Sequence, residues 1–282
     1  MATKQVSCYN CHSNRNELYD TENGFNLVKC LDCGLLYVNP RPLDTDIDQA
    51  AQTGQHAGDN LIDTTGAFNE QRVTNYLSIL GEFYPHARNA TKPQSWLDIG
   101  AGHGEFLKAV QNFIGPKLQA KGLEPNANKR ASAARHGLDI DYFDLDQHEE
   151  VYDFVSLLNV FSHLPDPVQA LANWKRLVKV DGELLLETGD SANLDRRHHH
   201  RPYYLPDHLS FASQDIVVGI LERVGFRVLD IRKYRSPAYP VFSLGNLFKQ
   251  TVKLVRPNRQ ASFNFFPKHG STDMWIRARR VD

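Results

Sequence analysis

The chain has 282 residues, a length that suits one large domain or a large domain with a small appendage. It is 41% hydrophobic and 23% charged, with 18 Gly and 14 Pro, which excludes a disordered chain, a collagen-like fibre and a low-complexity tract. The net charge of −1 provides no global basic field for nucleic acid, and no apolar run reaches the length of a membrane span. Because the first residues lack the pattern of a signal peptide, we expect a cytoplasmic protein without a membrane segment.

All four cysteines lie within the first 33 residues, as two C-x2-C pairs. Two such turns complete a tetrahedral site of four sulfurs, which suits zinc. Disulfides and a redox C-x-x-C pair are the alternatives. Disulfides are disfavoured in a cytosolic chain, and a redox site would need only one of the two C-x2-C pairs and leave the other unexplained. Four thiolates leave no open coordination position, so the predicted zinc is structural. The predicted ligands are Cys8, Cys11, Cys30 and Cys33.

The N-terminal part divides into three predicted segments. Residues 1–42 form the zinc ribbon, with short strands at 25–30 and 34–38. Residues 43–66 are poor in large apolar side chains and are interpreted as a linker or mobile flap. A helix is expected at 68–84, where apolar side chains recur at intervals of three and four.

Strands and helices then alternate through residues 67–282, which is typical of an α/β protein with a doubly wound parallel sheet. An aromatic-rich insertion at 234–271 interrupts this alternation before the last strand. The expected strands are 95–99, 120–124, 138–143, 152–158, 183–187, 226–231 and 274–279. The expected helices are 106–114, 126–137, 168–179 and 213–224.

A glycine-rich turn, residues 98–104, follows the first of these strands and opens the next helix. Glycine is needed where a backbone turns tightly and a ligand approaches closely, and a helix N-terminus favours an anionic group. The second strand ends at Glu124, whose carboxylate can accept both ribose hydroxyls of an adenosine. The alternative is that these are three ordinary turn glycines and that the Glu is unrelated to them. A cofactor site is favoured because the strand, the glycine turn, the helix, the second strand and the acidic residue follow one another in the expected order.

The turn resembles the first motif of the class I S-adenosylmethionine-dependent methyltransferases, and residues 122–125 are similar to their second, acidic motif. Residues 152–167 and 177–183 resemble the fourth-strand region and the turn into the fifth strand. The resemblance implies a Rossmann-like sheet of seven mostly parallel strands in the order 3-2-1-4-5-7-6, with S-adenosylmethionine as cofactor. N-P-P-Y is absent after the fourth strand, which disfavours a nucleobase amine as acceptor.

The resemblance also implies which residues meet the cofactor. The glycine turn would pass beside its methionine part, Glu124 would hold the ribose, and residues 144–145 would lie by the adenine. Asn159 and Phe161 would border the methyl-transfer site. The implied set is Asp98, Gly100, Ala101, Gly102, Gly104, Glu124, Asp144, Leu145, Asn159 and Phe161.

A second resemblance concerns the acceptor. The cysteine segment followed by residues 37–42, together with residues 204–211, is similar to zinc-containing methyltransferases of sugar and natural-product pathways, although their large C-terminal domain is lacking. In the Tyr-x-x-x-His-Leu-Ser-Phe segment of that family, tyrosine and histidine lie by the acceptor. We therefore expect His208 to be a general base or acceptor-orienting group with Tyr204 as its hydrogen-bonding companion; the alternative is a helix cap.

Two further candidates lie on the same sheet edge. His163 follows the fourth strand and is a catalytic candidate, although a hydrogen bond that fixes the turn is the favoured alternative. The cationic run at 196–201 offers Arg196, Arg197 and Arg201 for a carboxylate or phosphate on the acceptor, and a solvated loop is its alternative.

These features favour a small-molecule methyltransferase with a structural zinc ribbon, acting on oxygen or carbon. A ribosomal-RNA base methyltransferase is the first alternative, because some enzymes of that class join a zinc knuckle to this fold. Residues 1–45 carry a net charge of 4 − 5 = −1, which disfavours RNA binding, whereas residues 251–282 carry 7 − 2 = +5. A catalytically inactive zinc-ribbon adaptor is the second alternative, and the intact glycine turn and Glu124 argue against it.

Overall fold

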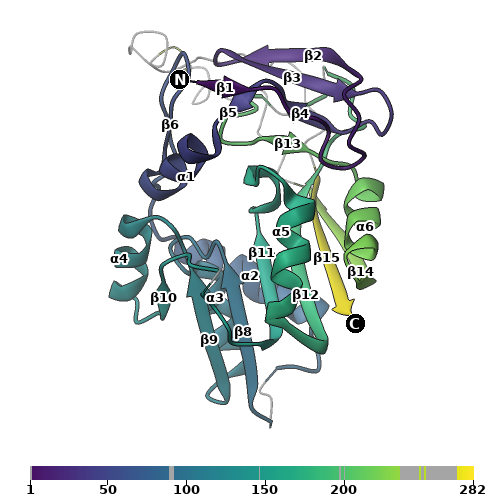
Figure 1. Ribbon diagram of the computed structural model, residues 1–282. Helices are drawn as coiled ribbons and strands as arrows, with labels where there is room; N and C mark the ends of the chain where they lie inside the picture. The colour runs from purple at the N-terminus through teal and green to yellow at the C-terminus, as the bar shows by residue number, and fades with distance from the viewer. Residues whose placement is uncertain are drawn as a thin grey trace.

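The computed structural model describes residues 2–88, 92–145, 147–196, 198–199, 201–235, 248, 251 and 272–282 (Figure 1). Nearly all of the predicted 234–271 insertion lies outside these residues; its first two form the end of a strand.

The central element is a seven-stranded sheet with the order β10-β9-β8-β11-β12-β15-β14, which confirms the predicted 3-2-1-4-5-7-6 order. Neighbouring strands pair in parallel except β15, which is antiparallel to both of its neighbours. The strands are β8 (Gln94–Ile99), β9 (Leu118–Leu123), β10 (Ile140–Asp141), β11 (Tyr152–Leu158), β12 (Val178–Asp190), β14 (Phe226–Arg235) and β15 (Thr272–Arg280).

Helices cover both faces of the sheet because successive strand residues point to opposite sides. Trp96 of β8 packs with α2 (Glu70–Phe83) and α3 (Glu105–Ile114), whereas its neighbour Leu97 belongs to the core on the other face. That second core also contains side chains of α5 (Pro167–Trp174) and α6 (Gln214–Arg223), and α4 (Ala127–Arg135) lies beside β10. Ser213 caps α6 as predicted, accepting from the backbone N–H of Ile216. None of the described helices is both long and apolar enough to span a bilayer.

The N-terminal ribbon is built on β2 (Asn16–Glu22), β3 (Phe25–Cys30) and β4 (Leu36–Val38), and it lies above the carboxyl ends of the parallel strands (Figure 1). A fourth strand, β13 (Ser210–Phe211), comes from the far part of the chain and pairs with β4. Two smaller strands, β1 (Thr3–Lys4) and β5 (Arg41–Pro42), pair with each other. One continuous hydrophobic core joins the ribbon to the large sheet.

The segment expected to be a linker or flap contains regular structure. Helix α1 (Asp44–Thr53) ends at Gly54, which has a φ of 74° and donates its N–H to the carbonyl of Ala50. A short hairpin of β6 (Gln55–His56) and β7 (Ile62–Asp63) follows. Helix α1 lies over a cavity rather than over the core, and only its Ala50 is buried. Its sequence therefore lacks the apolar stripe from which a helix could have been predicted.

Candidate active site

A cavity of about 790 Å³ opens between the carboxyl edge of the sheet and the segment that contains α1 and the β6–β7 hairpin. Ligands in parallel α/β folds bind at this edge. From the sheet side the lining includes Asp98, Gly100, Ala101, Gly102, His103, Glu105, Glu124, Tyr142, Phe143, Asp144, Leu145, Asn159, His163 and Asp207. From the other side it includes Asp46, Ile47, Ala51, His56, Thr64, Thr65 and Gly66.

The three glycines of the turn have separate roles, and all have positive φ values. A Cβ on Gly100 would lie 2.4 Å from Val160 Cγ2, and a Cβ on Gly104 would lie 2.4 Å from Leu138 Cδ1. A Cβ on Gly102 would meet no protein atom within 4 Å. Gly102 lines the cavity, so a side chain there would occupy space that is open to a ligand.

Glu124 follows the end of β9 and is 4% exposed. One carboxylate oxygen accepts from the N–H of Gly102 at 2.8 Å, and the other accepts from the N–H of Asn126 at 3.0 Å. An ionised carboxylate has about four acceptor sites, so two remain for hydroxyl donors. The residue predicted to hold the ribose is therefore held against the glycine turn with acceptor capacity left.

Two further groups at the turn are suited to a polar ligand. Burial raises the pKa of Asp98 to about 7, and a hydrogen bond from Ser156 at 2.5 Å opposes this shift. His103 is 9% exposed and its Nε2 lies 2.7 Å from the carbonyl oxygen of Thr65. Its Nδ1 is buried without a partner in the described part of the chain. A buried polar atom without a partner is costly, which indicates a ligand group at this position.

The remaining predicted cofactor residues are divided between the cavity and its surroundings. Ala101, Asp144, Leu145 and Asn159 line the cavity. Gly104 instead precedes α3 as its N-cap, and Phe161 is 1% exposed and packs edge-on against Tyr9 of the ribbon. Neither is among the lining residues.

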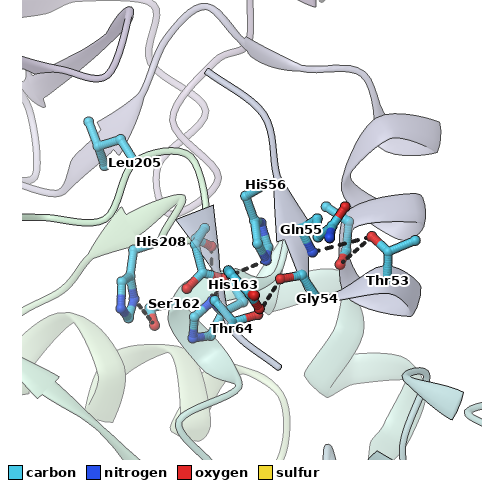
Figure 2. Close-up of polar contacts among 12 residues, drawn as sticks. Thr53, Gly54, Gln55, His56, Thr64, Ser162, His163, Leu205 and His208 are labelled. Carbon is cyan, nitrogen blue, oxygen red and sulfur yellow. Dashed lines mark hydrogen bonds and ion pairs between the residues drawn. The ribbon is translucent and has the colours of Figure 1, made fainter. Parts of the chain in front are cut away.

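A group of polar side chains, which we call the histidine cluster, consists of His56, His163, Asp207 and His208. The first three line the cavity, and His208 lies beside His163 outside the lining; Figure 2 shows the three histidines. Oδ1 of Asp207 lies 3.0 Å from His163 Nδ1 and 3.1 Å from His56 Nε2. His163 Nδ1 is also 2.9 Å from the backbone carbonyl of Asp207. Because both neighbours of His163 Nδ1 are acceptors, this nitrogen carries the proton and Nε2 is the basic nitrogen.

Burial and charge act in opposite directions on these groups. Burial lowers the pKa of His163, but the charge and hydrogen bonds of Asp207 outweigh it and hold this pKa above its ordinary value. Burial dominates at His56 and lowers its pKa despite Asp207. At Asp207, burial opposes ionisation, but His163 and His56 together bring its pKa well below the usual range. The cluster is therefore an ionised carboxylate between one imidazole of raised pKa and one of lowered pKa.

The predicted pair of His208 and Tyr204 is arranged differently from the expectation. The backbone N–H of His208 donates to the carbonyl of Tyr204 at 3.2 Å, but Tyr204 has a φ of 62° and the segment is a turn rather than a helix. Tyr204 is 44% exposed, and neither residue is among those lining the cavity. His208 Nδ1 lies 2.9 Å from the hydroxyl oxygen of Ser162, and its ring is 4.4 Å from that of His163. His208 thus supports His163 from behind the cavity wall.

The arginines of the cationic run face the ribbon. Arg196 Nη2 lies 2.5 Å from Asp20, and Arg201 also pairs with this carboxylate. Tyr203 donates its hydroxyl to Asp20 at 2.8 Å, and the carboxylate is almost fully buried. Neither described arginine lines the cavity, and Arg197 lies outside the described residues. These two arginines tie the segment before β13 to strand β2.

The four cysteine sulfurs lie within 4.8 Å of one another, as the C-x2-C spacing predicts. Cys8 and Cys33 are 3.5 Å apart at sulfur, and so are Cys11 and Cys30. Four sulfurs at about 2.3 Å from a tetrahedral zinc would be roughly 3.8 Å apart, which is close to these separations. The donor set therefore fits a closed zinc site.

The sequence did not identify His56, His103 or Asp207 as site residues, although all three line the cavity. Asp207 lies inside the 204–211 segment, and His103 inside the glycine turn, so both were near an identified motif. His56 belongs to the segment interpreted as a linker, and no local pattern marks it. Its role depends on a contact with Asp207, which is distant in the sequence.

Comparison with known proteins agrees with this geometry. The family model for a methyltransferase domain matches residues 68–231. The ubiquinone biosynthesis O-methyltransferase of Actinobacillus pleuropneumoniae serotype 7 is 29% identical over 140 residues, which are 45% of this chain and 58% of that protein. Its counterpart in Sodalis glossinidius is 26% identical over 162 residues, 50% of this chain and 65% of that protein. The chain thus matches less than two thirds of each relative.

Among solved structures, a SAM-dependent methyltransferase from Archaeoglobus fulgidus superimposes with a TM-score of 0.51 at 17% identity, covering 74% of this chain and 94% of that one. This likeness shows the fold. The family model covers more than half of the chain, including the glycine turn, Glu124 and His163. The chain therefore belongs to the S-adenosylmethionine-dependent methyltransferases, as the glycine turn and the acidic strand end predicted.

Proposed function

We propose that the protein transfers the methyl group of S-adenosylmethionine to a hydroxyl oxygen of a small-molecule acceptor, with His163 as the general base. One observation carries the proposal: the pair of His163 and Asp207 lines the same cavity as the glycine turn and Glu124. The names of the curated relatives, which are O-methyltransferases, support oxygen as the acceptor atom.

The residues of the cavity have distinct roles in this proposal. Glu124 would hold the ribose, and the turn at Gly102 would lie along the methionine part. When bound, the cofactor supplies an electrophilic methyl carbon on a positively charged sulfur. His163 Nε2 would take the hydroxyl proton as the new oxygen–carbon bond forms, and the electron pair of the breaking carbon–sulfur bond stays on sulfur. Asp207 would stabilise the imidazolium that results.

His208 and Tyr204 remain acceptor-side residues in this proposal. His208 contacts the ring of His163 and Ser162, so we assign it the orienting role, with the base role given to the histidine that lines the cavity. Tyr204 supplies the carbonyl that closes the turn carrying Asp207 and His208. We assign Arg196 and Arg201 to holding this segment on the ribbon.

The experiment uses the purified chain with methyl-labelled S-adenosylmethionine and a fractionated extract of hydroxylated small molecules. We expect label in a small molecule and a loss of about two to four powers of ten in kcat for His163→Asn, with S-adenosylhomocysteine binding unchanged. Transfer of label to RNA would contradict the acceptor class. Full activity of His163→Asn would contradict the base.

We also propose that the four cysteines bind one structural zinc ion. Their sulfur geometry and the absence of an open coordination position in a four-thiolate site support this. Elemental analysis should find about one zinc per chain. Purified protein with no bound metal and four titratable thiols would overturn the assignment.

A further inference from the structure

His56 has no role in the reaction proposed above, although it is one of the most enclosed polar side chains in the cavity wall. Its side chain is 11% exposed, and Nε2 lies 3.1 Å from Oδ1 of Asp207. This is the same oxygen that His163 contacts at 3.0 Å. Two imidazoles from different parts of the chain thus meet at one carboxylate oxygen, His163 through a hydrogen bond and His56 through an electrostatic contact.

The hairpin that carries His56 is held by specific contacts. Gly54 accepts from the N–H of Thr64 at 2.8 Å, which closes the hairpin at its base. Thr65, just beyond it, offers its carbonyl to His103 of the glycine turn at 2.7 Å. At the other end, Asn23 of the ribbon bonds both backbone groups of Asn60. The position of His56 is therefore set by the ribbon and by the cofactor turn together.

The charges around Asp207 determine what His56 does there. The charged or titratable groups that act on this part of the cluster are His163, His208, His56 and Lys129, and Glu187 of β12 interacts electrostatically with His163. Burial lowers the pKa of His56 and the charge of Asp207 opposes this shift, so the His56 imidazole at 3.1 Å shares the field of that carboxylate with His163. The remaining charge of that carboxylate acts on His163.

We infer that His56 is a positioning residue of the acceptor site, which fixes the Asp207 carboxylate against His163 and limits how strongly that carboxylate holds the proton of the base. The inference rests on the proposed function in that it takes His163 as the base. The inference assigns a positioning role in the reaction to a residue of the segment that contains α1 and the β6–β7 hairpin.

The sign of the effect follows from the geometry. Removing the His56 imidazole leaves more of the charge of Asp207 to act on the His163 imidazolium, so His163 binds its proton more tightly. The base is then available only at higher pH. We expect the acidic limb of the kcat/KM profile to move to higher pH, with a loss of about threefold to tenfold on that limb and no loss on the alkaline plateau.

The test measures the proton directly, by NMR titration of the His163 ring in the full-length, S-adenosylhomocysteine-bound protein. His56→Ala and His56→Leu remove the imidazole, and the leucine variant keeps the bulk of the side chain. His56→Gln keeps a polar N–H group at this position, and the exposed His86→Ala serves as the matched control. We expect the titration midpoint of His163 to rise in the first two variants and to match the wild type in the other two. Identical midpoints in all five proteins would overturn the inference.

A second readout separates this inference from the proposed function. If His163→Asn leaves methyl transfer intact while the His56 variants shift the titration, the base is misassigned but the coupling stands. If His163→Asn abolishes transfer while His56→Leu leaves both the titration and the pH profile unchanged, the base stands and the role of His56 is refuted. Circular dichroism and cofactor affinity identify any variant whose hairpin has become detached. If the alanine and leucine variants are affected in this way, His56→Gln becomes the test: a wild-type pH profile supports the role of His56, and a shifted profile refutes it.

Discussion

Replacing Glu124 with alanine should weaken cofactor binding by an amount that can be worked from its contacts. The carboxylate is buried, and its two oxygens already accept from the N–H groups of Gly102 and Asn126. Hydrogen bonds to a charged group contribute about 1.5–3 kcal/mol. Loss of the ribose contacts should therefore raise the Kd for S-adenosylhomocysteine by roughly 10- to 150-fold, since 1.4 kcal/mol is a factor of ten.

Calorimetry on four proteins checks this value. Glu124→Gln keeps the side-chain volume and one acceptor oxygen, so its loss should be smaller than that of Glu124→Ala. Glu149→Ala removes an exposed carboxylate as a control and should bind as the wild type does. Because the alanine variant also leaves two backbone N–H groups without their acceptor, its thermal unfolding without cofactor should be measured in parallel. Wild-type affinity in both Glu124 variants would show that the ribose lies elsewhere.

Three further changes examine other parts of the molecule. Gly102→Val should abolish measurable cofactor binding, since its side chain would enter the open cavity space and the backbone φ of 58° is strained for valine; retained binding in calorimetry would refute this. Cys30→Ser should destabilise the ribbon and release the metal, as followed by elemental analysis and thermal unfolding, and an unchanged melting curve would count against a structural ion. Asp20→Asn should cost only about 1–3 kcal/mol of unfolding free energy, because Arg196 and Arg201 are partly exposed and solvent screens their charges. The substitution should also loosen the segment before β13 and so raise the acceptor KM more than the cofactor Kd. An acceptor KM equal to that of the wild type would refute the anchoring role.

The parts of the fold that the sequence predicted are those set by local pattern. Strand β11 is found at the expected residues, and the glycine turn and Glu124 meet as the strand–turn–helix order required. Helix α1 was missed because only Ala50 is buried, and β10 is shorter than expected because only two of its residues pair with β9. The predicted helix at 168–179 ends at Trp174, since the long strand β12 already begins at Val178.

The site shows the same division between local and distant determinants. Motif spacing predicted the cofactor turn and the acceptor-side candidates His208 and His163, but it gave no sign that Asp207 contacts His163 and His56. The histidine cluster is assembled from a hairpin, the turn after β11 and the segment before β13, which meet only in three dimensions. No spacing within one segment carries that information. Contacts of this kind follow from tertiary packing and require the structure.

The pairing of β13 with β4 has a consequence for how the chain acquires its structure. Tyr37 opposes Ser210 in this ladder, so the N-terminal sheet stays open along β4 until most of the polypeptide has left the ribosome. All three residues of β4 are buried in the finished protein, and an uncovered apolar edge is a template for strand addition by another chain. Non-local pairings of this kind also slow folding. The ribbon strands β2 to β4 are thus synthesised first, but their sheet is completed only when β13 has been made. A fragment confined to residues 1–66 would carry this open edge and would aggregate rather than fold as an autonomous unit.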